Sequence, residues 1–149
     1  VFTRDTSHAA LNEAWRDPRG LIWGDIGKKD DGSIWPMVHS SEYMKQLGRP
    51  LPEGQLGAKE YCESIGARLP SIEEFISLRE DMGAQPETNE GYSHHNDKIL
   101  PNLSGYWFWS SSVYPDNSPY GAYDFNGSFG DIGYGYRIYY VAVRCVVGR

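Results

Sequence analysis

Lysine and glutamate are missing from a large part of this chain: neither occurs in the 35 residues from Tyr106 to Tyr140. Basic residues are also in deficit overall, because 14 lysines and arginines face 20 aspartates and glutamates, for a net charge of −6. From residue 106 to the end, three aspartates balance three arginines. A nucleic-acid groove needs a stripe of basic residues along one face of the protein. The sequence therefore predicts no nucleic-acid partner.

Long apolar runs are lacking as well. No stretch approaches the roughly 20 apolar residues that span a bilayer. The opening "VFTRDTSHAA" has no apolar central region of the kind found in signal peptides. We therefore expect no direct insertion of this chain into a membrane. Its 149 residues suit a single domain, residues 1–149, with one sizeable core.

Cysteine is scarce. The chain has Cys62 in "AKEYCESIG" and Cys145 in "VAVRCVVGR", and no others. Two separate buried thiols are one interpretation. The other is a single disulfide that closes a loop of about 80 residues and stabilises the fold by roughly 4 kcal/mol. Spacing in the sequence does not fix geometry in space, so the residues alone leave both interpretations open.

Two helices are well marked in the middle of the chain. Apolar residues of segment 58–65 follow helical spacing, and Gly66 ends the run. In "LPSIEEFISLREDMG", Ser71 and Glu74 have the S-x-x-E spacing of a capping box, and Gly83 is a C-terminal stop. Both segments are therefore predicted to be helical.

From Tyr106 onward the apolar period changes to two. "YWFWSSSVY" predicts a strand, "AYDFNGSFGDI" predicts a hairpin that turns at Asn126–Gly127, and "YYVAVRCVV" predicts a last strand. Residues 84–104 show no period and are expected to form a long surface loop. Helices followed by an antiparallel, glycine-rich tail indicate an α+β fold.

Several separated motifs resemble one known family. They are "A-x-x-Y-C-x-x-x-G-A-R-L-P-S-x-E-E-F", "W-F-W-S-S-S", the terminal "V-R-C-V", and "AWRDPRGLIWGD", which is similar to a "D-x-x-T-G-L-x-W" opening. Together they resemble the C-type-lectin-like fold, and within it the bacterial branch typified by the C-terminal domains of collagen-like adhesins (the Lcl-C type). The resemblance extends from about Trp15 to Arg144.

The resemblance implies two helices packed on small twisted antiparallel sheets with long loops, and chain ends that lie close together. It also implies a disulfide between Cys62 and Cys145, and therefore an exported protein. On the same basis we expect the C-terminal head of a longer exported protein, displayed at a cell surface or facing the periplasm. Family habit further predicts a homotrimer. Its ligand would be a glycan or a surface protein on another cell.

The family binds ligands through the loops between its last strands, and here those loops are rich in tyrosine. Tyrosine and tryptophan provide large contact areas at a low cost in conformational entropy, while serine, glycine and asparagine provide adaptable hydrogen bonds. We expect Trp107, Trp109 and Phe125 to lie in the core. An arginine in this stretch could pair with an acidic sugar or with Asp131. The predicted ligand-binding residues are Tyr114, Asp116, Asn117, Tyr120, Tyr123, Asn126, Asp131, Tyr134, Tyr136, Arg137 and Tyr139.

Metal chemistry is weakly indicated. Lectins of this fold often bind calcium through a Glu-Pro-Asn or Gln-Pro-Asp triplet and a Trp-Asn-Asp triplet. Only the approximate match Gln85–Glu87 occurs here. Aspartates and asparagines of the tail could supply oxygen ligands, but turns explain them as well. His94 and His95 are adjacent and lack the spacing of zinc ligands. We expect no cofactor, with bound calcium as the alternative.

Catalysis is the second alternative. "RLPSIEEF" is also similar to a motif of formylglycine-generating enzymes, which work through a reactive cysteine pair beyond the structural positions. Cys62 and Cys145 both match structural positions, and Ser110–Ser112 lies in a strand pattern without a nucleophile elbow. We therefore expect a non-catalytic recognition domain. A trimeric fibre head without a specific ligand remains a further interpretation.

Overall fold

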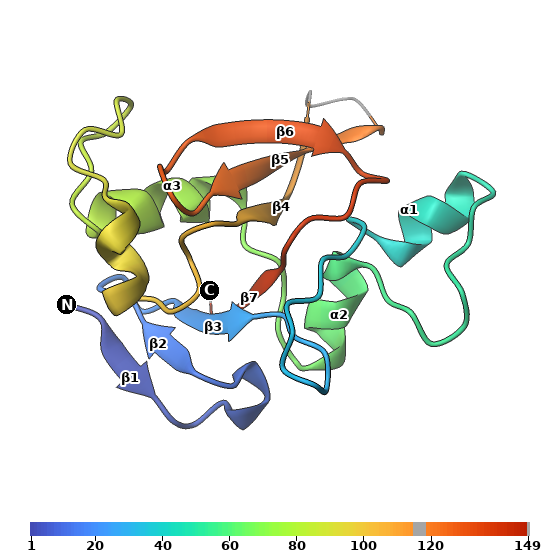
Figure 1. The fold of residues 1–149 in the computed structure, drawn as a ribbon, viewed down its shortest axis with the longest axis horizontal. Helices are drawn as coiled ribbons and strands as arrows, with labels where there is room; N and C mark the ends of the chain where they lie inside the picture. Colours follow the sequence, from blue (N-terminus) through green and yellow to red (C-terminus); the bar gives the residue numbers. More distant parts are fainter. Residues whose placement is uncertain (115–118, 149) are drawn as a thin grey trace.

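A computed structural model describes residues 1–114 and 119–148, apart from the side chains of His94, His95 and Tyr114. Within these residues the fold is α+β, with three α-helices and two small antiparallel sheets (Figure 1). The strands are β1 (Thr3–Asp5), β2 (Ala14–Arg16), β3 (Ile22–Ile26), β4 (Trp107–Tyr114), β5 (Gly121–Asn126), β6 (Ile132–Tyr136) and β7 (Arg144–Val147). The helices are α1 (Ser41–Gln46), α2 (Ala58–Ser64) and α3 (Ile72–Asp81), with 3-10 turns η1 (Ala9–Leu11) and η2 (His94–Lys98).

The first sheet joins the two ends of the chain. Its strand order is β1-β2-β3-β7, so that the last strand pairs with β3, antiparallel, with Trp23 opposite Val146. The second sheet has the order β4-β5-β6 and lies on the other side of the molecule (Figure 1). None of the helices in the described part of the chain is long and apolar enough to cross a membrane.

A disulfide fastens α2 to β7. Cys62 and Cys145 are bonded, with their Cα atoms 5.5 Å apart and 83 positions apart in the sequence. The predicted disulfide is thus confirmed. A cross-link over a loop of this length stabilises the fold by roughly 4 kcal/mol, chiefly because it restricts the unfolded chain.

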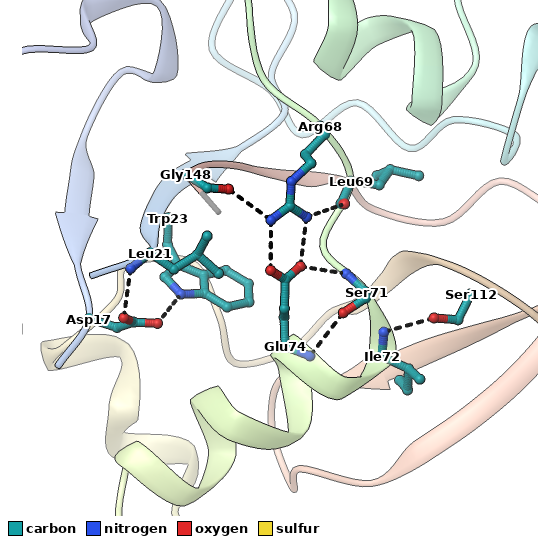
Figure 2. Close-up of polar contacts among 10 residues, drawn as sticks. All are labelled: Asp17, Leu21, Trp23, Arg68, Leu69, Ser71, Ile72, Glu74, Ser112 and Gly148. Carbon is teal, nitrogen blue, oxygen red and sulfur yellow. Dashed lines mark hydrogen bonds and ion pairs between the residues drawn. The ribbon is translucent and has the colours of Figure 1, made fainter. Parts of the chain in front are cut away.

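The capping box at the start of α3 is also confirmed. The Ser71 hydroxyl accepts the Glu74 backbone N–H, and the Glu74 carboxylate accepts the Ser71 backbone N–H. The same carboxylate receives two hydrogen bonds of 2.7 Å from Arg68, which also donates to the Gly148 carbonyl. The motif "RLPSIEEF" therefore joins the start of α3 to the end of the chain (Figure 2).

The motif "AWRDPRGLIWGD" also stabilises the fold. The buried carboxylate of Asp17 accepts the Leu21 backbone N–H and the indole N–H of Trp23, each at 2.9 Å (Figure 2). The Ser112 hydroxyl of β4 accepts the Ile72 backbone N–H at 3.0 Å. These hydrogen-bonded residues of the resembling motifs thus help to hold the fold together.

Aromatic stacking fills the space between α3 and the second sheet. Phe75 of α3 stacks on Phe125 of β5 with ring centroids 4.8 Å apart, and Trp23 lies 5.3 Å from Phe75. All three side chains are fully buried. Each buried ring stabilises the fold by roughly 2–3 kcal/mol. A second buried cluster surrounds the disulfide and includes Trp109. The core assignments of Trp109 and Phe125 are therefore confirmed.

Trp107 departs from its prediction, because 41% of its surface is exposed. It precedes Phe108 on β4 and so points to the opposite face. Phe108 faces the core beneath α3, whereas Trp107 lies at the end of the sheet opposite Asn126. Trp109 shares the face of Trp107 and is fully buried, so the exposure of Trp107 follows from its place at the end of the strand.

Two loop predictions also need correction. The segment 84–104 is only partly a surface loop, since it includes η2 and the fully buried Leu100 and Leu103, which fill the core beside α3. The hairpin of β5 and β6 is confirmed, but its turn is longer than predicted. β5 ends at Asn126 and β6 begins only at Ile132.

Candidate functional site

A groove of about 570 Å³ lies between the second sheet and the segment that leads to β7. We call it the aromatic groove. Three separate parts of the chain form it: the loop after β3, the strands β4 to β6, and residues 140–142. Its main side chains are those of Ile34, Pro36, Trp107, Asp124, Tyr134 and Tyr140.

The position of Asp124 follows from the alternation of β5. Its neighbour Phe125 points into the core, so Asp124 points to the other face of the sheet. On that face it lies between Trp109 of β4 and Gly133 of β6, its partners in register. A side-chain carbon at Gly133 would lie 2.6 Å from Asp124 Oδ1 and 2.8 Å from the Trp107 ring. Glycine at this position therefore allows the carboxylate and the indole to pack over β6.

Asp124 is an unusual acidic residue because it is only 8% exposed. Its Oδ1 atom is buried and has no hydrogen-bond partner among the residues that the structure describes. Burial raises the pKa of Asp124 from its ordinary value of 3.8 to about 6, against a smaller opposing effect of its own backbone N–H. Buried polar atoms are normally hydrogen-bonded, and an exception calls for an explanation.

Large rings surround this carboxylate. Trp107 is partly exposed, and Tyr134 and Tyr140 each keep more than half of their surface in solvent. All three line the aromatic groove. Such rings offer flat apolar faces with polar groups at their edges. The groove therefore combines stacking surfaces with a single negative charge at its floor.

The predicted ligand-binding tyrosines line two different hollows. Tyr134 lines the aromatic groove, whereas Tyr120 and Tyr136 line a smaller hollow of about 270 Å³ beside Tyr43. The Tyr139 ring contacts the Tyr136 ring edge-on, with centroids 5.6 Å apart.

Tyr123 differs from these residues, because it is half-buried and packs against the core cluster that contains Phe125. Asn126 is used by its own turn, where the side-chain oxygen accepts the backbone N–H groups of Ser128 and Phe129. Asp116 and Asn117 lie outside the described residues, as does the side chain of Tyr114.

Arg137 is held by the protein itself. Its guanidinium lies 4.1 Å from the centre of the Tyr43 ring, donates to His39 Nδ1 at 3.1 Å and donates to the Pro119 carbonyl at 3.0 Å. Asp131, one of the two partners considered for Arg137, does not pair with it: that exposed carboxylate accepts a hydrogen bond from the Asn89 amide instead. The sequence around Arg137 could not reveal this, because Tyr43 and His39 belong to a segment more than 90 residues away.

His39 is a neutral structural residue. It is buried, its Nε2 donates to the Ser110 carbonyl at 2.7 Å, and its Nδ1 accepts from Arg137. Burial is the main cause that lowers the pKa of His39 to about 4. The Ser110 hydroxyl donates to the Tyr123 carbonyl at 2.8 Å. Both side chains thus have structural hydrogen bonds.

The described residues considered as calcium ligands lie on different segments. Asp124 lies under the groove and Asp131 at the β5–β6 turn, and Gln85 belongs to the loop after α3. Across residues 1–114 and 119–148, leaving aside the side chains of His94 and His95, no three side chains of histidine, cysteine, aspartate or glutamate are arranged to hold a metal ion.

Of the described residues that line the groove, only Tyr134 was among the predicted ligand-binding residues, and the side chains of Trp107, Asp124 and Tyr140 are the main ones that were missed. One signal could have indicated Asp124. In "GAYDFN" Asp124 alternates with the apolar Phe125. It lies opposite the buried Trp109, so that a charged side chain lies on a largely apolar face of the sheet. The contribution of Tyr140 has no such local signal, because it depends on how the segment before β7 crosses the sheet.

Comparisons of the chain with protein-family models, with curated proteins and with solved structures give no match. The functional assignment therefore depends on the geometry and chemistry of the aromatic groove.

Proposed function

We propose that this chain is a non-catalytic recognition domain that binds a glycan in the aromatic groove. The observation that carries the proposal is the pairing of exposed rings with a nearly buried carboxylate that has an unpartnered oxygen. Trp107, Tyr134 and Tyr140 can stack on the apolar faces of sugar rings. Asp124 can accept hydrogen bonds from sugar groups that enter the groove.

The volume of the groove suits this ligand class. At about 570 Å³ it falls within the range of small-molecule sites, which extends from roughly 300 to 1,000 Å³. Its lining is mostly apolar or aromatic, with few polar side chains, as is usual for such sites.

An exported location is part of the proposal. Disulfides persist in oxidising environments such as the periplasm and the cell surface, and the Cys62–Cys145 bond supports such a location. The resemblance to the heads of collagen-like adhesins supports display on the surface of a bacterium or a phage. A trimer would suit this role, because weak single sites gain greatly in avidity when they are linked.

A glycan array probed with the oligomeric domain tests the proposal. We expect binding to a limited set of glycans, and a loss of at least about tenfold in affinity for Trp107→Ala, since a central aromatic anchor typically contributes 1–3 kcal/mol. Tyr136→Ala is the matched control, because it removes an exposed ring of the same sheet outside the groove. A domain that binds no glycan, or binds a surface protein instead, would contradict the proposal and favour a fibre head or a protein receptor.

A further inference from the structure

We propose that the aromatic groove selects glycans that carry a free ammonium group, and that Asp124 is the counter-charge for it. This inference rests on the proposed function, since it names the class of sugar that the same groove would bind. It adds a claim about charge that a groove for neutral sugars does not require.

The aromatic groove is lined by a single charged side chain among its described residues. Among its described lining residues, Asp124 is the only charged one, and the nearby residues supply tyrosines, glycines and aliphatic side chains. The Oδ1 atom of Asp124 receives no hydrogen bond from any residue that the structure describes. A ligand thus meets one negative charge without a basic residue beside it. Anionic sugars would be repelled by this charge, and a cation would be attracted.

Keeping the Asp124 carboxylate ionised at such low exposure costs free energy. A neutral hydroxyl could be recognised by an amide or by another hydroxyl, and neither would place an ionised group at 8% exposure. A buried carboxylate with one unpartnered oxygen destabilises the free protein. That cost is offset when a ligand brings the opposite charge. We therefore attribute the charge of Asp124 at the groove to a cationic group that is present only in the complex.

The rings around Asp124 favour the same ligand. Trp107, Tyr134 and Tyr140 line the groove beside the carboxylate. Faces of aromatic rings attract ammonium groups electrostatically, tryptophan most strongly. Gly133 lets the Trp107 ring and Asp124 Oδ1 approach the same point on β6. Stacking and charge would thus act on one sugar unit, through its ring and through its amine.

Isothermal titration calorimetry with matched oligosaccharides tests the inference. The probes are a glucosamine tetramer, its fully N-acetylated form and a glucose tetramer with the same linkage. They are titrated into the wild type, Asp124→Asn and Trp107→Ala. We expect the wild type to bind the glucosamine tetramer at least about tenfold more tightly than the other two, because a close charge pair at an interface can strengthen binding by this factor or more. Asp124→Asn should remove this preference and keep the affinity for the neutral tetramers, and Trp107→Ala should weaken all three.

Three results would overturn the inference, and they differ in what they say of the proposed function. If all three tetramers bind the wild type equally and Trp107→Ala weakens each, the glycan site stands and the ammonium preference is wrong. If the preference survives in Asp124→Asn, another group supplies the charge. If no tetramer binds while choline or a lysine peptide does, then both the glycan function and the amino-sugar ligand are wrong. Thermal melting of both variants shows whether they are folded.

Discussion

Replacing Asp124 by asparagine should change how the free energy of unfolding depends on pH. In the folded protein, burial raises the pKa of Asp124 to about 6, compared with an ordinary value of 3.8. The folded state therefore holds the proton more tightly than the unfolded chain does. The resulting stabilisation is fully present below about pH 4 and is lost as the pH rises through about 6. A difference of about two pKa units corresponds to roughly 3 kcal/mol.

His39 acts in the opposite direction over nearly the same range. Its pKa is lowered from 6.5 to about 4, so the folded state resists protonation. The stability that depends on neutral His39 is present above about pH 6.5 and is lost as the pH falls toward 4. In the wild type the contributions of Asp124 and His39 largely cancel. The pH dependence of the wild type alone therefore reveals neither of them.

The informative quantity is the difference between the wild type and Asp124→Asn at each pH. Denaturant unfolding at a series of values from about pH 3.5 to 7.5 gives this difference, because each midpoint and slope yields a free energy of unfolding. The buried amide of asparagine adds an offset that does not vary with pH. From the acidic to the neutral end of the range, the difference should shift by roughly 3 kcal/mol in favour of the asparagine variant. Parallel curves would refute the reasoning, since they would show that Asp124 titrates as an exposed carboxyl does.

Three further predictions concern the stability of the fold and the oligomeric state. Ser71→Ala should lower the free energy of unfolding by about 1 kcal/mol without changing ligand affinity, because it removes one bond of the capping box at α3; an unchanged denaturation midpoint would contradict this. Cys145→Ser should cost roughly 2–5 kcal/mol, and thiol titration of the denatured, unreduced wild type should find no reactive cysteine, whereas two free thiols would disprove the bond. Sedimentation at micromolar concentration should give three times the mass of the 16.9 kDa chain, and a monomer would count against a trimer formed by this domain alone.

The parts of the fold that the sequence could predict are those set by local rules. The capping box of α3 and the hairpin of β5 and β6 depend on residues that are neighbours in the chain, and both were predicted from their motifs. The disulfide was left open by spacing and came only from the family resemblance. It joins positions 83 residues apart, a separation about which local chemistry carries no information.

The aromatic groove could not be predicted in the same way. It requires the loop after β3, the sheet β4-β5-β6 and the segment before β7 to meet. Tyrosine and tryptophan suit both a packed strand and an exposed face. Trp107 and Trp109 share one face of β4, and the alternation of the strand does not tell which of them other segments of the chain cover. Arg137, similarly, is an exposed cation by its sequence context but is held by Tyr43 and His39 in the fold.

A chemical-shift titration of isotope-labelled protein with a bound glycan tests the central claim most directly. If the aromatic groove is the site, the largest shifts should belong to the Trp107 indole and to the backbone amides of Asp124 and Gly133. The signals of Tyr43 and Tyr136, in the smaller hollow, should stay nearly unchanged. Shifts confined to that hollow, with none at Trp107, would contradict the account and place recognition outside the aromatic groove.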